Sequence, residues 1–353
     1  MNEFDQYKKL GEPGALKKAE NWRVAIGLQQ VDGLTPSRYL IEIAKQNIEG
    51  RISIDDAGKQ ITQYYKKNPA KTIVEKGKKE ADEVSARIVK LLSNKAFSFS
   101  PAEYIAIHKF LFTGVLSAKI AGKIRDYDIS KEEPVLNGDS VSYCRSDSIW
   151  ETLNFDFAQE KAFTYKGLSK RETAEHIAKF ASGIWQIHPF GEGNTRTTAV
   201  FIIKYLRTLG FKADNELFEE NSRYFRDALA RANYNNHEKN IHDTMEYVNR
   251  FFGNLLLGAN HALDFREVRV GFVDTVNDTA SPRGDTVNDT VNPRGDTVFS
   301  LMAKDNKITA VKLAASLGVS VITVKREIKR LKNNGIIERI GSDKTGAWKV
   351  LIK

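Results

Sequence analysis

A run of reactive side chains lies between two apolar stretches in the middle of the chain, in the segment IWQIHPFGEGNTRTTAVF. His188 precedes a glycine-containing loop at 191–194, and Arg196 follows the loop closely. Apolar residues at helical spacing on both sides predict that one helix ends at His188 and another begins after the glycines. Such a loop presents unpaired backbone N–H groups at a helix N-terminus, where they bind an anion such as phosphate.

The charged residues of this run fit one class of reaction. Arg196 can add a charge-assisted contact to a phosphate. Glu192 would repel the phosphate unless a divalent cation such as Mg²⁺ bridges the two. His188 is placed to take a proton from an incoming hydroxyl group. A base, a carboxylate, an anion nest and an arginine in one short run predict phosphoryl or nucleotidyl transfer.

The same run resembles the motif of the Fic (Fic/Doc) family, H-x-F-x-[D/E]-G-N-G-R-x-x-R. Six of the eight specified positions match: His188, Phe190, Glu192, Gly193, Asn194 and Arg196. The resemblance covers roughly residues 96–260 and includes the segments AGKIRDYDIS, VLNGDSVSYC and LFEENSRYFRDALARANYNN. It implies a mainly α-helical fold with a β-hairpin flap.

The resemblance also implies an activity, the transfer of AMP from ATP to a Ser, Thr or Tyr hydroxyl of a target protein or of the enzyme itself. His188 would then be the general base, Glu192 would hold Mg²⁺, and Phe190 would be buried under the loop. The nucleotide phosphates would be bound by Gly193, Asn194, Thr195 and Arg196.

Other residues receive roles from the same resemblance. The flap would pair with the backbone of the target protein by adding a strand, and its residues are Val141, Ser142 and Tyr143. Three residues of the later helices are candidates for lining the nucleotide pocket, although aromatic side chains on such helices are more often part of the core. They are Tyr224, Asn233 and Tyr234.

Two positions depart from the motif. Thr195 replaces its third glycine, and a β-branched side chain strongly disfavours a positive φ there. Ala199 replaces the final arginine, which in the family grips the γ-phosphate, so ATP would bind less tightly or in another pose. Arg223 and Arg226 are candidates to supply the missing guanidinium.

The N-terminal region contains a candidate inhibitory helix at about 36–50. Many Fic proteins are similar in carrying an inhibitory helix of pattern [S/T]-x-x-x-E-[G/N], and NIEG, with Glu49 and Gly50, resembles its end. Lys45 stands at the Ser/Thr position, and the usual arginine partner is Ala199 here. Glu49 is therefore either an inhibitory residue or an ordinary glutamate near the end of a packing helix.

Further helices must position these residues. Thr35 and Pro36 predict a helix start, and apolar spacing predicts additional helices at about 53–66, 75–92, 101–112, 169–187, 194–209 and 221–257. Asn137 and Gly138 lie between β-prone runs, which predicts the turn of a hairpin.

The C-terminal residues resemble a winged helix-turn-helix. Three short helices are expected, with Val324, Ile328 and Leu331 facing a core, followed by a β-wing in ERIGSDKTGAWKVLI. Residues 299–353 carry 12 Lys and Arg against 4 Asp and Glu, most of the chain's net charge of +9. A basic segment of this kind predicts a DNA partner, or alternatively a protein partner.

The composition divides the 353 residues into four parts. They are an N-terminal helical region (1–95), a Fic catalytic domain (96–265), a linker with an 11-residue repeat (266–298) and the winged helix (299–353). The sequence contains neither an apolar span of membrane length nor a signal-peptide core. Together with the single cysteine, Cys144, this predicts a cytoplasmic protein without a membrane partner.

Three hypotheses about function follow. The first is a protein adenylyltransferase that uses ATP and Mg²⁺ and is inhibited through Glu49. The second is transfer of phosphate or another phosphate-containing group, because Ala199 alters the donor site. The third is a DNA-binding regulator whose weakly active Fic domain senses a nucleotide.

Overall fold

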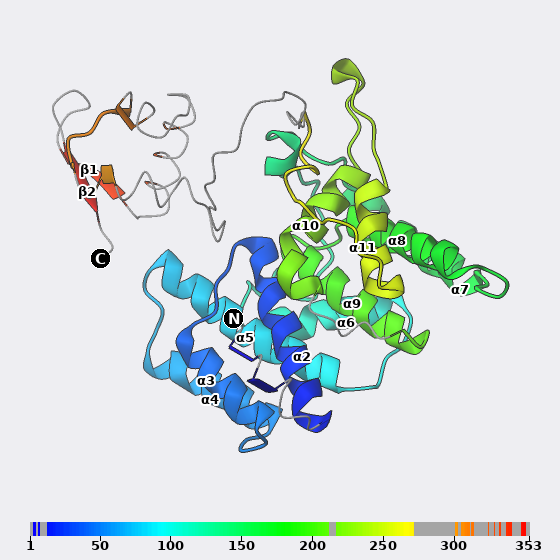
Figure 1. Ribbon diagram of the computed structural model, residues 1–353, viewed down its shortest axis with the longest axis horizontal. Helices are drawn as coiled ribbons and strands as arrows, with labels where there is room; N and C mark the ends of the chain where they lie inside the picture. The colour runs from blue at the N-terminus through cyan, green and yellow to red at the C-terminus, as the bar shows by residue number, and fades with distance from the viewer. Residues whose placement is uncertain are drawn as a thin grey trace, which may run out of the picture. The chain divides into compact units, whose positions relative to one another are not determined.

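A computed structural model describes residues 3–4, 6–7, 13–211 and 217–271, and in the C-terminal part residues 301–302, 305–310, 312–313, 324, 328, 332, 337–340 and 347–350. The chain divides into two compact units, Met1–Thr275 and Val276–Lys353 (Figure 1). Within the described ranges, no helix is both long and apolar enough to cross a membrane.

The first unit consists of α-helices and short 3₁₀ helices (Figure 1). The α-helices are α2 (Pro13–Gly27), α3 (Arg38–Ile48), α4 (Ile54–Lys67), α5 (Ile73–Ser93), α6 (Pro101–Phe112), α7 (Ile149–Ala162), α8 (Lys170–Ile187), α9 (Asn194–Thr208), α10 (Leu217–Ala232) and α11 (Glu246–Leu257). The 3₁₀ helices are η1 (Leu28–Asp32), η2 (Pro134–Leu136), η3 (Ser146–Ser148) and η4 (His237–Lys239). The mainly α fold class predicted from the sequence is confirmed.

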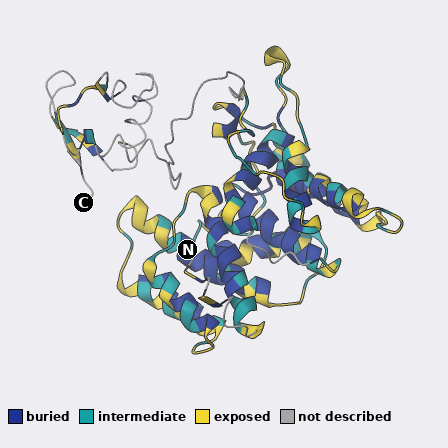
Figure 2. Cartoon of the chain, viewed as in Figure 1, coloured by how far each residue is buried: buried dark blue, intermediate teal, exposed yellow. Residues whose placement is uncertain are grey.

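Helix α9 is the most deeply buried helix next to the reactive run. Every residue from Asn194 to Leu206 is buried, and the helix packs against α5, α6, α8 and η1. Figure 2 shows this concentration of buried residues in the middle of the unit. Because the glycine-containing loop runs directly into α9, the core fixes where the loop lies.

Local sequence signals start several helices where the sequence predicts them. Ser169 begins α8 with a capping box, in which its hydroxyl accepts from the N–H of Glu172 and the Glu172 carboxylate accepts from the N–H of Ser169. Ser53 and Ser100 cap α4 and α6 in the same way with their hydroxyl groups. Each cap satisfies a backbone N–H that the first helical turn leaves unpaired.

The predicted start of α3 at Thr35 is wrong, because Ser37 caps this helix. The Ser37 hydroxyl accepts from the N–H of Leu40 and donates to Asp82 of α5 at 2.5 Å, and the Ser37 N–H donates to the same carboxylate at 2.8 Å. Tyr65 of α4 also donates to Asp82, at 2.7 Å. This buried carboxylate therefore joins α3, α4 and α5 and selects Ser37 over Thr35.

Other elements differ from the expectations. Helices α2 and α7 are absent from the predicted set, and the single helix expected at 221–257 is divided into α10 and α11. The segment between them is rich in asparagine: the Asn236 side chain caps η4, and Asn240 takes a left-handed φ of 51°. Asparagine side chains that bond to the local backbone compete with helix formation, which explains the break.

The predicted β-hairpin flap is only partly correct. Asn137 and Gly138 form a turn with φ of 58° and 95°, and the N–H of Glu133 donates to the Asp139 carbonyl at 3.0 Å. Residues 122–148, all of them described, contain no β-strand. The 3₁₀ helix η2 occupies one side of the turn, and its internal hydrogen bonds replace the ladder that a hairpin requires.

Residues 266–271, expected to begin the linker, pack against this turn. Val268 is buried, the N–H of Val270 donates to the Val135 carbonyl at 2.9 Å, and the Asn137 amide donates to the Val270 carbonyl. The 11-residue repeat lies outside the described residues.

In the second unit, strands β1 (Ile337–Ile340) and β2 (Ala347–Val350) pair antiparallel, with Ile337 opposite Val350. A small core contains Met302, Ile308, Leu313, Val324, Ile328 and Ile337. The predicted wing strands and the burial of Val324 and Ile328 are confirmed. Leu331 lies outside the described residues.

Candidate active site

The loop between α8 and α9 is held in one conformation. His188 ends α8 with a left-handed φ of 49°. The side-chain amide of Asn194 accepts from the N–H of Phe190 at 3.0 Å and donates to the Phe190 carbonyl at 2.7 Å. Gly193 has φ 77°, and a Cβ there would lie 2.5 Å from the Phe112 ring. Both the dihedral angle and the space therefore require glycine.

The imidazole of His188 is set up as a base. Its side chain is buried, and Nδ1 lies 3.2 Å from the Trp185 carbonyl oxygen. A carbonyl can only accept, so Nδ1 carries the proton and Nε2 holds a lone pair. Among the described residues, Nε2 has no hydrogen-bond partner. Burial lowers the pKa of His188 well below its usual range, and Lys131 and Arg125 lower it further.

Two buried side chains, Arg125 and His108, donate hydrogen bonds to carbonyl groups of the loop. The Arg125 guanidinium donates to the carbonyl groups of His188 at 2.8 Å, of Tyr127 at 2.7 Å and of Cys144. His108 of α6 donates from Nε2 to the Glu192 carbonyl and accepts at Nδ1 from the N–H of Gly122, both at 2.9 Å. Burial lowers the pKa of His108 to about 4, so it remains neutral in this supporting role.

Most of the predicted motif residues meet at one cavity of about 40 Å³. Its walls contain His188, Glu192, Gly193, Asn194 and Thr195. Lys131, Asp32, Glu133, Trp185 and Arg226 complete the lining. The walls thus combine an unpaired base, backbone N–H groups at the start of α9, and charges of both signs.

Arg196 lies beside this cavity but is bound to residues of the N-terminal helices. Its side chain is 1% exposed, and it pairs with Asp32 of η1 and Glu80 of α5, each at 2.7 Å. It also donates to the Gln29 amide oxygen at 3.0 Å. The guanidinium expected to anchor phosphate is therefore neutralised by two carboxylates of the same chain.

The two departures from the motif have different consequences. Thr195 lies in the first turn of α9, where no positive φ is needed, and its hydroxyl accepts from the Trp185 indole N–H at 3.0 Å. The change from glycine is thus compatible with the helix. Ala199 is completely buried and leaves its position without a charged group.

The predicted flap residues lie next to the base. The Tyr143 ring centroid is 4.1 Å from that of His188, and its hydroxyl donates to Glu133 at 3.2 Å. Val141 is buried, and the Ser142 carbonyl accepts from Gln186 of α8 at 3.1 Å.

Four predicted site residues are not brought to the cavity. Glu49 accepts from the Tyr7 hydroxyl at 2.7 Å and pairs with Arg51. Tyr224 donates to the Tyr247 carbonyl. Asn233 bonds to Ser182, and Tyr234 donates to Asp139. None of these four residues lines the cavity.

The acidic residues that reach Arg196, Asp32 and Glu80, were not predicted from the sequence. A signal was present, because the N-terminal region contains two acid–glycine pairs at helix ends, Asp32–Gly33 and Glu49–Gly50. Both glycines have positive φ, 68° and 78°. The resemblance pointed to the second pair, whereas η1 carries the first to the site. Glu80, in the middle of a long helix, gave no local signal.

Glu192 fits a magnesium ion that is held mainly by phosphate. Its carboxylate lines the cavity and is 46% exposed, with Lys131 Nζ at 3.9 Å. Mg²⁺ typically uses one or two carboxylates together with substrate phosphates and water. Within the described residues there is no cluster of three or more His, Cys, Asp or Glu side chains placed for a metal.

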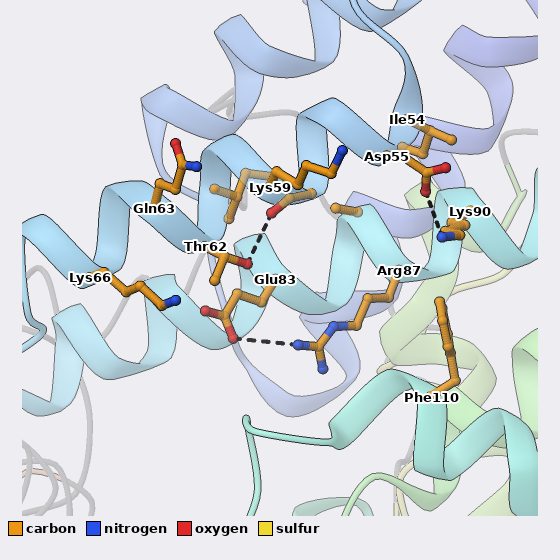
Figure 3. A pocket seen from close by; sticks show the side chains of 13 residues that line it. Ile54, Asp55, Lys59, Thr62, Gln63, Lys66, Glu83, Arg87, Lys90 and Phe110 are labelled. Atoms are coloured by element: carbon orange, nitrogen blue, oxygen red, sulfur yellow. Dashed lines mark hydrogen bonds and ion pairs between the residues drawn. The ribbon is translucent and has the colours of Figure 1, made fainter.

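A larger groove, of about 360 Å³, lies between α4 and α5 (Figure 3). Asp55 pairs with Lys90 at 2.5 Å across it, and Glu83 faces Arg87 at 3.9 Å. Phe110 lies at one end. The groove contains none of the motif residues, so the smaller cavity is the candidate active site.

Comparison with known proteins matches the part of the chain that contains the loop. Residues 98–206 match the Fic/DOC family model, and residues 298–338 match a model for winged helix-turn-helix DNA-binding domains. Two separate parts of the chain are therefore similar to these two kinds of domain.

One curated relative and three solved structures are similar to parts of the chain. A probable protein adenylyltransferase of Sinorhizobium fredii (strain NBRC 101917 / NGR234) is 32% identical over 135 residues. That match covers 37% of this chain and 64% of the relative, less than two thirds of its length.

The solved structures share lower identity. The N-terminal FIC domain of Bep8 from Bartonella sp. 1-1C is 19% identical, covering 54% of this chain and 88% of that one, with a TM-score of 0.41. BepC with bound AMPPNP from Bartonella tribocorum is 19% identical, covering 51% and 87%, with a TM-score of 0.39. A Fic family protein from Desulfovibrio desulfuricans G20 is 14% identical, covering 98% and 90%, with a TM-score of 0.42.

Proposed function

We propose that the first unit is a protein adenylyltransferase that transfers AMP from ATP to a Ser, Thr or Tyr hydroxyl of a protein. The observation that carries this proposal is the buried, unpartnered Nε2 lone pair of His188 beside the N-terminus of α9. A neutral imidazole in this position accepts a proton from a bound hydroxyl. The family match at 98–206 and the curated relative support the same reaction.

The proposed reaction has one chemical step. The target hydroxyl gives its proton to His188 Nε2, and its oxygen forms a bond to the α-phosphorus of ATP. The bond between the α-phosphorus and the bridging oxygen breaks, and pyrophosphate leaves. Backbone N–H groups at the start of α9 stabilise the charge on the phosphate oxygens. Glu192 would hold Mg²⁺, which neutralises phosphate charge when bound.

The segment Val141–Tyr143 is proposed to receive the target protein. Its side beside His188 carries the Tyr143 ring, so a chain added along this segment would place its hydroxyl near the base. The target protein and ATP thus approach the loop 188–194 from different sides.

The activity is tested by incubating the protein with α-labelled ATP and Mg²⁺. We expect label in the protein itself or in an added target, and none with His188→Ala. Equal labelling of the two proteins would show that the proposed AMP transfer is wrong. Mass spectrometry of the labelled product distinguishes AMP from phosphate, which is the second candidate because Ala199 removes the usual γ-phosphate ligand.

We also propose that the N-terminal helices inhibit this activity through Asp32. Asp32 lines the cavity and holds Arg196 at 2.7 Å, so its carboxylate lies where a phosphate oxygen of the donor would bind. A phosphate must displace this carboxylate before it can bind. The donor therefore binds only the fraction of molecules in which the pair of Asp32 and Arg196 is open, and this lowers the apparent affinity for the donor.

This inhibition predicts that Asp32→Ala increases labelling several-fold, since the donor phosphate no longer has to separate an ion pair at the buried Arg196. Glu49→Ala is the matched control, because Glu49 also ends an N-terminal helical segment but lies away from the motif. Activation by Glu49→Ala without activation by Asp32→Ala would contradict the assignment to Asp32.

A second function is proposed for the C-terminal unit, binding to DNA. The match at 298–338 and the basic composition of residues 299–353 favour it. We expect the full chain to bind duplex DNA with an affinity that falls steeply with salt, and a chain that ends at residue 298 to lose this binding. Failure of the full chain to bind at low salt would exclude this function.

A further inference from the structure

Arg226 and Lys131 are the two cationic residues that line the cavity, and Arg226 is the guanidinium among them. It comes from α10, some 30 residues after the motif, and lines the same cavity as His188, Glu192 and Asn194. Within the described part of the chain, its guanidinium donates one hydrogen bond, from Nη2 to Glu133 at 2.8 Å. A guanidinium has five N–H donors, so donors remain for a ligand.

The surroundings hold Arg226 in this position. Glu133 is 1% exposed, and its other carboxylate oxygen accepts from the Tyr143 hydroxyl. A buried carboxylate with two donors fixes the guanidinium that pairs with it. The Arg226 side chain itself is 27% exposed, which leaves one side of it open to the cavity.

The lining of the cavity indicates that an anion belongs beside Arg226. Asp32 and Arg226 both line it, and the Asp32 carboxylate lies 2.7 Å from the Arg196 guanidinium. Without the Asp32 carboxylate, Arg196 would keep one carboxylate partner, Glu80, and the cavity that Arg226 lines would lose a negative charge.

Arg223, the other arginine proposed to replace the missing motif residue, is excluded by its position. It is 60% exposed, pairs with Asp227 at 3.7 Å and stacks on Phe265 at 4.0 Å. It does not line the cavity.

We propose that Arg226 replaces the missing motif arginine and binds the distal phosphates of a nucleoside triphosphate, with Arg196 on the other side. The proposal rests on the proposed function, since it assumes that the donor's phosphates enter this cavity. It assigns the donor as a triphosphate whose tail is recognised by a residue outside the motif. Ala199 carries no charge in α9, and α10 supplies the charge.

The test measures binding of ATP and AMP, each with Mg²⁺, by calorimetry in full-length Asp32→Ala protein. We expect ATP to bind more tightly than AMP. Addition of Arg226→Ala should weaken the binding of ATP at least 10-fold, since a charge-assisted contact to phosphate is lost. The affinity for AMP should change less than twofold. Arg223→Ala is the matched control on the same helix, and the preference for ATP should persist.

Arg226→Ala leaves Glu133 buried without its charged partner, which can unfold the protein. A second variant therefore controls for loss of binding that is caused by unfolding. The double change Glu133→Gln with Arg226→Gln removes both charges and keeps polar side chains at the two positions, and it should also abolish the preference for ATP. A preference for ATP that survives in both variants, or equal binding of ATP and AMP in Asp32→Ala protein, would overturn the proposal.

These outcomes separate this inference from the proposed function, because binding is measured without a target protein. If the protein transfers AMP and its preference for ATP over AMP is unchanged in the Arg226 variants, only the role of Arg226 is refuted. Loss of the ATP preference in a protein that transfers no AMP would support the role of Arg226 and refute only the reaction.

Discussion

His188 combines two properties that depend on each other. Its left-handed backbone ends α8, and its Nδ1–H bonds to the Trp185 carbonyl in the last turn of the same helix. The hydrogen bond from Nδ1–H to Trp185 fixes the tautomer of the imidazole. The lone pair is therefore on Nε2, on the other side of the ring. A low pKa keeps that lone pair available at neutral pH, and the cations around the cavity contribute to this low pKa.

The pH dependence of AMP transfer should follow from this environment. A base works only when unprotonated, so activity should stay constant as the pH falls through 6.5 and decline only well below it. Lys131→Met removes a charge that lowers the pKa of His188. The acidic limb of kcat/KM should then move to higher pH. A shift to lower pH would contradict this account.

Gly193 is the residue where the loop allows least variation. Gly193→Ala should destabilise the protein by about 2–4 kcal/mol, because it combines a left-handed φ with a collision against Phe112. Gly114→Ala is the matched control, since Gly114 has φ 74° with open space around it, and should cost about 1 kcal/mol. Equal losses in thermal unfolding would show that Phe112 moves aside.

At the scale of elements, the helix starts that depend only on neighbouring residues could be predicted from the sequence. The caps at Ser53, Ser100 and Ser169 and the helices that follow them were predictable, because a hydroxyl and the next turn suffice to form each. Ser37 was missed because its choice depends on Asp82, 45 residues away. The missing strands of the flap and the acids at Arg196 have the same cause, since both depend on segments distant in sequence.

Asp82 gives a test of how the N-terminal helices are held together. Asp82→Ala leaves the Ser37 N–H, the Ser37 hydroxyl and the Tyr65 hydroxyl without their acceptor. The expected loss of unfolding free energy is about 2–4 kcal/mol, measured by denaturant unfolding. Asp56→Ala, which removes an exposed carboxylate at the start of α4, should change stability little. Similar effects of both variants would refute the joining role of Asp82.

At the scale of the whole molecule, the residues with proposed catalytic and inhibitory roles all lie before residue 272. Asp32, Glu80, Arg196 and Arg226 belong to the unit Met1–Thr275. The resemblance located the motif because it is contiguous. It left both Arg223 and Arg226 as replacements for the missing arginine, and the lining of the cavity distinguishes the two. Residues 299–353 carry most of the chain's net charge.

This division predicts that inhibition needs only the first unit. Asp32→Ala should increase AMP labelling by the same factor in the full chain and in a chain that ends at residue 271, because every contact of Asp32 described above lies within that range. The labelling assay is run on the unchanged and the Asp32→Ala protein at each of the two chain lengths, and the two factors are compared. An increase confined to the full chain would place the C-terminal unit in the inhibitory mechanism.

In the proposed mechanism, the pairing of Asp32 with Arg196 makes the inhibitor part of the same polypeptide as the active site. A competitor tethered in this way acts at an effective concentration on the order of millimolar, independent of how much protein is present. The fraction of inhibited molecules is therefore the same at every protein concentration. It changes when ATP competes with the carboxylate, or when an event such as the binding of a partner to the N-terminal helices moves η1 away from α9.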